Sequence, residues 1–138
     1  KIGKTINDLM IGEKSHITET ITDKDLLLYL GLTNDNNPLY IQHDYAKTTL
    51  YEKPIVPTIL LNGIITSAIS KHLPGPGSHI QQQFLTYHKP VYHDETIEFH
   101  LQIDDIDKME HTVKVTVHGF NEKQLAIVSG SITVIPPQ

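Results

Sequence analysis

Apolar and polar residues alternate along residues 97–103, 113–118 and 126–134, and this period of two predicts β-strands. Residues 80–88 and a weaker pattern at 14–20 predict two further strands. Strands with one apolar and one polar face are typical of an antiparallel sheet that is covered on one side and wet on the other. Most of the second half of the chain is therefore predicted to form such a sheet.

A different pattern at residues 58–72 predicts a long helix that ends before the turn-forming residues 74–77. Its apolar side chains cover most of the circumference: Ile59, Leu60, Leu61, Ile64, Ile65, Ala68 and Ile69. A helix this apolar in a globular protein is expected to be buried, so we expect the sheet to wrap around it.

A shorter helix is predicted to begin after Thr22, because a threonine followed three residues later by an acid, here Asp25, can satisfy free amides at a helix start. Gly31 is its expected end. Its apolar side is formed by Leu26, Leu27, Tyr29 and Leu30. The polar segments 104–110 and 121–123 are expected to form hairpin connections. The predicted fold class is α+β, a curved antiparallel sheet wrapped around one long buried helix.

The chain of 138 residues is long enough for one core and shows no repeat or linker, so residues 1–138 are predicted to form a single domain. Its formal net charge of −5 argues against nucleic acid as a partner, since phosphate binding requires a surface rich in Lys and Arg. The absence of cysteine excludes disulfides and thiolate metal sites and fits a cytoplasmic protein. The longest apolar run, 55–69, is shorter than the roughly 20 residues of a membrane span, so no membrane partner is expected.

Residues 33–57 show no regular pattern, so they are predicted to form a long irregular segment with a helical turn around 44–48. Such long segments in a compact domain are usually functional. The segment contains Asp35-Asn36-Asn37-Pro38-Leu39-Tyr40. Asx residues before a proline commonly form turns, which is the simplest interpretation of this motif alone. Together with the apolar helix that follows, the motif predicts a carboxylate, Asp35, held in a buried turn.

In the order and spacing of its motifs the chain resembles the MaoC-like (R)-specific enoyl-CoA hydratases, members of the hot-dog fold superfamily. The resemblance covers nearly the whole chain. It rests on Asp35 to Leu39, Tyr45-Ala46, Pro54-Ile55-Val56, Leu73-Pro74-Gly75, and Pro90-Val91 followed by Asp94-Glu95. The order of these stretches, rather than any one of them, makes the resemblance specific.

The resemblance implies a hot-dog fold and a hydro-lyase of fatty acid metabolism that adds water to a trans-2-enoyl-CoA thioester. By position, Asp35 would activate the water, Asn37 would support the turn, and the Thr58 N–H would bind the thioester oxygen. Pro38 and Thr66, a hydroxyl two turns into the long helix, would contact the substrate. The family implies no cofactor or metal, and a homodimer with the site near the subunit boundary. The role of Thr58 also follows from elementary physics, because unpaired amides at a helix N-terminus stabilise negative charge.

The chain departs from the family at Tyr40, where the family has a histidine, and at Pro57-Thr58, where the family has histidine-glycine. Histidine exchanges protons near pH 7, whereas the phenol of a tyrosine titrates only near pH ~10. Tyr40 could donate a hydrogen bond or act as a weak acid, or it could be a packed aromatic residue. His43 could supply the missing imidazole, although an exposed loop residue is the simpler interpretation.

Three functions remain open at this point. The first is a hydratase with Asp35 as base, the Thr58 N–H as oxyanion donor and Tyr40 as a modest donor, slowed by loss of the motif histidine. The second is a catalytically silent acyl-CoA-binding protein. The third is a hot-dog acyl-CoA thioesterase, for which a carboxylate and an oxyanion donor are sufficient.

Coenzyme A is polyanionic whereas the chain is net acidic, so local basic groups must receive it. Lys53 and Lys89, together with Lys47, are the candidates, because they lie in the irregular segment and in the turn before the strands. Lysines at such places are also ordinary surface residues in most proteins. The sequence therefore suggests which lysines could bind the phosphates of coenzyme A, but it does not predict which of them lie together.

Overall fold

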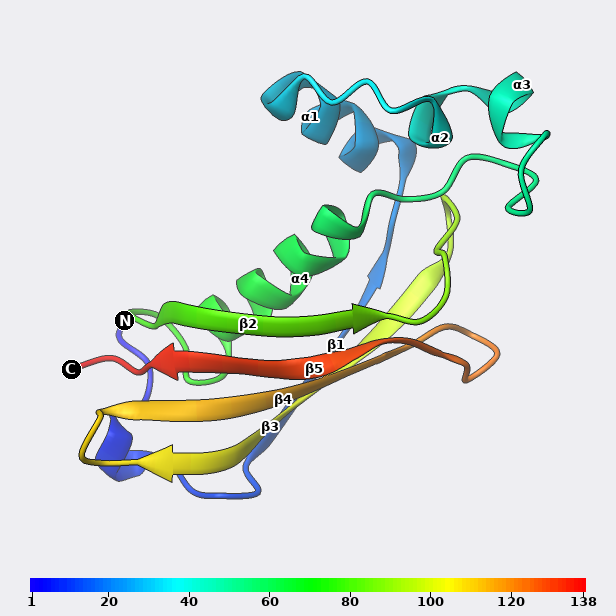
Figure 1. The fold of residues 1–138 in the computed structure, drawn as a ribbon. Coiled ribbons are helices and arrows are strands. Elements are labelled where there is room, and N and C mark those ends of the chain that lie inside the picture. Colours follow the sequence, from blue (N-terminus) through cyan, green and yellow to red (C-terminus); the bar gives the residue numbers. More distant parts are fainter.

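A five-stranded antiparallel sheet forms the body of the protein (Figure 1). The computed structural model describes all 138 residues. The strands are β1 (Lys14–Thr20), β2 (His79–Tyr87), β3 (Thr96–Asp107), β4 (Thr112–Phe120) and β5 (Ala126–Ile135). They pair in the order β1-β3-β4-β5-β2, so β1 and β2 are the two edges. The predicted antiparallel sheet and its five strands are confirmed.

The helices are α1 (Asp23–Thr33), α2 (Pro38–Ile41), α3 (His43–Ala46) and α4 (Thr58–Lys71), preceded by the short 3-10 helix η1 (Ile6–Asp8). α4 lies along the concave side of the curved sheet (Figure 1). Residues 23–46, which we call the arm, carry α1, α2 and α3 and stand over the N-terminal end of α4 (Figure 1). None of the helices has the length and apolarity needed to cross a membrane.

The core lies between α4 and the sheet. On α4 the buried side chains are Leu61, Ile65, Ala68 and Ile69. Buried apolar residues of β3, β4 and β5 complete the same cluster: Ile97, Phe99, Leu101, Ile103, Val113, Val115, Val117, Ile127, Val128, Ile132 and Val134. Burying one aliphatic side chain contributes about 1.5–3 kcal/mol, so this interface is the main source of stability.

The expectation that α4 is buried all round is wrong for a single chain. Ile59, in its first turn, is 50% exposed, and Thr58 and Gly63 are also exposed. The sheet covers only the side of α4 that carries residues such as Leu61 and Ile65. A strip of the helix therefore stays open beside the arm.

α1 begins where predicted, because the Thr22 N–H donates to Asp25 Oδ2 at 2.9 Å, as in a capping box. It ends later than predicted, at Thr33 instead of Gly31. Gly31 stays helical, and Asn34 takes the left-handed conformation that ends the helix, with a φ of 58°. Asparagine tolerates this conformation because its short amide side chain can hydrogen-bond locally.

Two other segments are more regular than predicted. The irregular segment contains α2 and α3, of which α3 begins one residue before the expected helical turn. β3 runs on to Asp107, with a shift in its pairing between Ile103 and Asp105, so its hairpin connection is residues 108–111. A β-bulge of this kind lets a strand continue past residues that interrupt its alternation.

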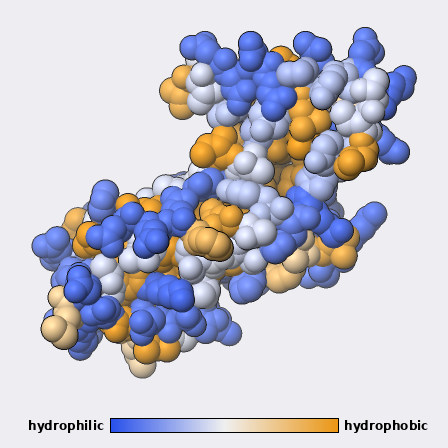
Figure 2. Space-filling model, in the orientation of Figure 1, coloured by the Kyte–Doolittle hydropathy of each residue, from blue (hydrophilic) through white to orange (hydrophobic).

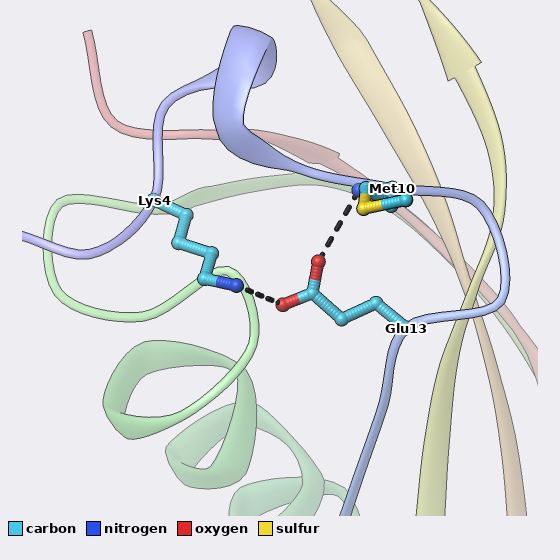
Figure 3. A network of polar contacts seen from close by, with 3 residues as sticks. All are labelled: Lys4, Met10 and Glu13. Carbon is cyan, nitrogen blue, oxygen red and sulfur yellow. Dashed lines mark hydrogen bonds and ion pairs between the residues drawn. The ribbon is translucent and has the colours of Figure 1, made fainter.

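The N-terminal segment ties the turn after α4 to the start of β1. The Lys4 N–H donates to Pro74 O at 2.9 Å in that turn. Figure 3 shows the Glu13 carboxylate accepting from the Lys4 ammonium at 2.6 Å and from the Met10 N–H at 3.2 Å. These contacts hold the far end of α4, opposite to the end that faces the arm.

Gly130 of β5 should tolerate no side chain, because a Cβ built there overlaps the backbone carbonyl oxygen of Phe84 in β2. Gly130→Ala should lower the free energy of unfolding in urea by about 2 kcal/mol or more. The matched control Gly31→Ala, at an exposed helical position with open space around it, should raise that free energy by about 0.5–1 kcal/mol. Equal effects of the two substitutions would contradict this prediction.

Candidate active site

The Asp35 motif begins where α1 ends. The Asp35 N–H donates to Thr33 Oγ1 at 3.2 Å, and Asp35 Oδ1 accepts the Asn37 N–H at 3.0 Å. Asn37 then caps α2, since its Oδ1 accepts the Leu39 N–H at 3.0 Å while Pro38 occupies the first turn. The motif is thus a series of Asx turns in which local hydrogen bonds orient the Asp35 carboxylate.

The prediction of a buried turn is wrong for the single chain. Asp35 is half-buried, and Asn36 and Asn37 are exposed. The arm has only two buried side chains, Leu26 and Ala46. Figure 2 shows it standing apart from the sheet with a hollow between them. Hydrogen bonds rather than burial therefore hold the carboxylate.

Tyr29 of α1 is the site residue that sequence reasoning missed. Its hydroxyl donates to Asp35 Oδ2 at 2.6 Å from six residues earlier in the chain. The apolar pattern of α1 assigns Tyr29 to packing, and packing is the usual role of an aromatic residue there. A phenol in the last turns of a helix that is followed at once by an acidic turn is the signal that could have found it.

The two partners of this hydrogen bond shift each other's pKa in opposite directions. The Asp35 carboxylate raises the pKa of the Tyr29 hydroxyl, with burial as the second cause. The Tyr29 hydroxyl, followed by the Asn37 N–H, lowers the pKa of Asp35. The phenol thus stays protonated and the carboxylate stays ionised over a wide pH range. The charge of Tyr40 is a further, smaller cause that raises the pKa of Tyr29.

The motif lies next to the N-terminal end of α4. The Ile55 N–H donates to Leu39 O at 3.2 Å, three residues before that helix begins. Beneath the arm, Tyr29 of α1 and Ile59 of α4 line one groove of about 390 Å³. The structure therefore brings Tyr29, the hydrogen-bond partner of Asp35, to the first turn of α4.

This first turn of α4 presents unpaired amides. Pro57 is the N-cap and has no N–H of its own, and no side chain caps the helix. The Thr58 N–H has no acceptor within the chain, and Thr58 is exposed. Amides at the positive end of a helix dipole suit an oxygen atom that gains negative charge.

Tyr40 lines a second groove, of about 660 Å³, against a different face of α1. His43 lines the same groove, so the imidazole considered as a replacement does lie near Tyr40. His93 lines it too, with a side chain only 15% exposed, and its Nδ1 lies 3.6 Å from Asp23 Oδ1. Neither ring nitrogen of His93 has a hydrogen-bond partner. The structure gathers two histidines in the groove of Tyr40.

Lys53 and Lys89 come from different loops and line one groove of about 650 Å³ together with Lys123. The Lys53 ammonium lies over the ring of Tyr92, 4.7 Å from its centroid, in a cation–π arrangement. Lys53 also lines the groove of Tyr40, so the two grooves adjoin at this residue. Two glutamates line the lysine groove as well, and Lys47 does not. The structure therefore brings Lys53 and Lys89 together in one groove, and Lys47 lies outside that groove.

Thr66 lies apart from these grooves. It is half-buried, and its Oγ1 donates to Asn62 Oδ1 at 3.2 Å. Asn62 also acts on Tyr87 of β2: burial raises the pKa of the Tyr87 hydroxyl, and the Asn62 side chain partly opposes this shift. Thr66 thus belongs to a polar seam between α4 and β2.

Comparison with known proteins places these features in one family. The model of the family described as "MaoC like domain" matches residues 10–123. The (R)-specific enoyl-CoA hydratase of Rhodospirillum rubrum is 28% identical over 132 residues, covering 94% of this chain and 90% of that protein.

Two solved structures are similar to this chain over most of its length. The unliganded R-hydratase PhaJ1 from Pseudomonas aeruginosa has a TM-score of 0.90 at 26% identity, covering 99% of this chain and 87% of that chain. The (R)-hydratase from Aeromonas caviae, described as involved in PHA biosynthesis, has a TM-score of 0.88 at 25% identity, covering 94% and 98%. These similarities confirm the expected hot-dog fold. The family match spans the Asp35 motif, α4 and most of the sheet, and it shows that the chain belongs to the MaoC-like domain family.

Proposed function

We propose that this protein is a hydro-lyase that adds water to a trans-2-enoyl-CoA and forms the (R)-3-hydroxyacyl-CoA. The observation that carries the proposal is the ionised Asp35 carboxylate, bound by Tyr29, whose side chain lines a groove with Ile59 in the first, uncapped turn of α4. The names of the similar proteins, which are (R)-specific enoyl-CoA hydratases, support this choice of substrate and reaction.

The proposed mechanism assigns one task to each group. The Thr58 N–H binds the thioester oxygen, which draws electrons from the C2–C3 double bond and opens C3 to attack. Asp35 removes a proton from water as the water oxygen bonds to C3. The resulting enolate takes a proton at C2, either directly from protonated Asp35 or from the Tyr40 hydroxyl, in which case protonated Asp35 gives its proton back to the Tyr40 phenolate. One water molecule is consumed, and both of its hydrogens are accounted for.

The remaining residues are assigned to binding. Asn37 and Pro38 hold the turn that presents Asp35. Thr66 is assigned to the acyl chain, because it offers a hydroxyl farther along α4. Lys53 and Lys89 are assigned to the phosphates of coenzyme A, which their shared groove next to that of Tyr40 supports.

Tyr40 favours a second candidate function, an acyl-CoA-binding protein without turnover. General acid–base help from one side chain contributes about 10²–10⁴-fold to a rate, and a phenol is not a ready base near neutral pH. The same carboxylate and amide could also serve a thioesterase, in which the C–S bond breaks and free thiol appears. The products formed from an enoyl-CoA, or the absence of any product, distinguish the hydratase, the thioesterase and the silent binding protein.

We also propose that two chains form a homodimer through β2. This strand is a sheet edge with one unpaired side, and Phe84 on it is 73% exposed. A second chain along this edge would extend the sheet and bring further cover to the open strip of α4. The half-buried Asp35 would then lie near a subunit boundary.

With a short trans-2-enoyl-CoA, the purified protein should remove the absorbance of the conjugated double bond without releasing free thiol. Asp35→Asn keeps the shape of the side chain but removes the base, so it should lower kcat by about 10²–10⁴-fold. The rate at which this absorbance falls measures the activity of the wild-type protein and of the Asp35→Asn variant.

Asp44→Asn, an exposed carboxylate in α3 of the same arm, is the matched control and should keep the wild-type rate. Thiol release would replace the hydratase proposal by a thioesterase, and acyl-CoA binding with neither signal would leave the silent binder. A pantetheine thioester, which lacks the nucleotide phosphates, should show a higher KM than the CoA thioester if Lys53 and Lys89 bind those phosphates.

Tyr40→His should raise kcat at pH 7 by about 10-fold or more, because it restores a side chain that exchanges protons near that pH. Tyr40→Phe removes the hydroxyl without adding an imidazole and should not raise the rate. A Tyr40→His enzyme no faster than wild type would contradict the proposed importance of this position.

Light scattering coupled to size-exclusion chromatography should give a mass of twice the 15.6 kDa of one chain. A charge placed on the free edge of β2, as in Phe84→Asp, should weaken this assembly, because an unpaired carboxylate would be buried in the new sheet. A wild-type protein that elutes as a monomer at micromolar concentration would refute the dimer.

A further inference from the structure

The hydrogen bond between Tyr29 and Asp35 is unusual for a surface arm, because it joins two partly buried side chains at 2.6 Å. We propose that Tyr29 is a positioning residue of the active site, which holds the Asp35 carboxylate in a single orientation. The inference rests on the proposed hydratase function and deepens it.

The carboxylate is held from two sides by different elements. The Tyr29 hydroxyl of α1 donates to Oδ2, and the Asn37 N–H of the following turn donates to Oδ1 at 3.0 Å. Two donors on opposite oxygens prevent the carboxylate from rotating freely. Each oxygen keeps a second lone pair, which leaves an acceptor site for a water molecule.

The same turn of α1 also holds the backbone of Asp35. Thr33 Oγ1 accepts the Asp35 N–H at 3.2 Å and donates to Tyr29 O at 2.8 Å. Side chain and backbone of Asp35 are therefore both tied to residues 29 and 33, one helical turn apart. A catalytic carboxylate must be placed within a fraction of an ångström, and this network does so where burial does not.

The hydrogen bonds keep the carboxylate ionised, although they also make it a weaker base. A hydrogen bond to the ionised form lowers the pKa of Asp35, and the Tyr29 hydroxyl is its largest cause. The conjugate acid is correspondingly stronger, so a protonated Asp35 readily gives its proton to C2 of the enolate. This matters here because Tyr40 cannot share the work as a histidine would.

The competing interpretation is that Tyr29 only packs in the groove between α1 and α4. Its ring would then matter and its hydroxyl would not. Tyr29→Phe separates the two, since it keeps the ring and removes the donor. Tyr45→Phe is the matched control, because Tyr45 lies in α3 of the same arm and its hydroxyl has no partner.

The test measures kcat, KM and their pH dependence, together with the titration of Asp35 followed by NMR of ¹³C-labelled aspartate and assigned with Asp35→Asn. Tyr29→Phe should raise the pKa of Asp35, move the acid limb of kcat to higher pH, and lower kcat by roughly ten- to a hundredfold with little change in KM. Tyr45→Phe should change none of these. In the Asp35→Asn background, adding Tyr29→Phe should have no further effect on kcat.

The outcomes separate this inference from the function on which it rests. If the wild-type protein hydrates the substrate and Tyr29→Phe keeps its kcat and acid limb, Tyr29 is only a packing residue and the inference is overturned. An additive loss in the double variant overturns it as well, because Tyr29 would then act independently of Asp35. If the wild-type protein hydrates nothing, the proposed function is refuted and the inference falls with it, whatever the NMR titration shows.

Discussion

The packing of α4 against the concave face of the sheet positions every other part of this protein. Leu61, Ile65 and Ile69 from the helix and residues such as Phe99 and Leu101 from the sheet form one apolar cluster that excludes water. Because the side chains interlock, the helix cannot slide or rotate without opening cavities. The unpaired amides at its first turn are thereby held in place before any ligand arrives, which is the condition under which such donors stabilise a developing charge.

The arm, in contrast, is held mainly by hydrogen bonds rather than by apolar packing. Only Leu26 and Ala46 are buried in it, so it gains little from the hydrophobic effect. Backbone hydrogen bonds attach it instead, such as the Ile55 N–H to Leu39 O, and the loop after it is attached by the Tyr92 hydroxyl to Tyr51 O at 2.7 Å. Segments with few buried contacts open at lower free energy than a core, and sites that admit a ligand are commonly built from them. A tightly packed helix and a less tightly packed arm thus line the same groove.

The arm carries two phenols, Tyr29 and Tyr40, and one of them is bound to Asp35. Tyr29 supplies a hydroxyl that donates to Asp35, whereas Tyr40 lines a groove on a different face of α1. The Tyr29 hydroxyl and the Asn37 N–H are neutral donors to this carboxylate, and both favour its ionised form. The nearby histidines, His43 and His93, line the groove of Tyr40 rather than the groove under α1. The arrangement therefore concentrates the proton chemistry on Asp35.

Much of the fold was predictable because buried and exposed positions alternate regularly along a strand or helix. Apolar and polar residues therefore recur in the sequence with the same period. β1 and α4 agree with the predicted ranges to within one residue, and β3 and β4 show the expected alternation. Single positions were less predictable: Gly31 and Asn34 can both end a helix, and only the local contacts decide between them. The bulge that lengthens β3 likewise depends on its partner strand.

For the site, the sequence by itself determined that an Asx-Pro turn with a carboxylate precedes a buried helix with a proline-headed start. Only the tertiary structure decided that Tyr29 would reach Asp35, that Lys53 and Lys89 would share a groove, and that the turn would stay half open in a single chain. The physical reason is that periodicity is a local property written in consecutive residues. The meeting of two side chains depends instead on the direction in which the chain leaves each element. After α1 the left-handed Asn34 sets that direction.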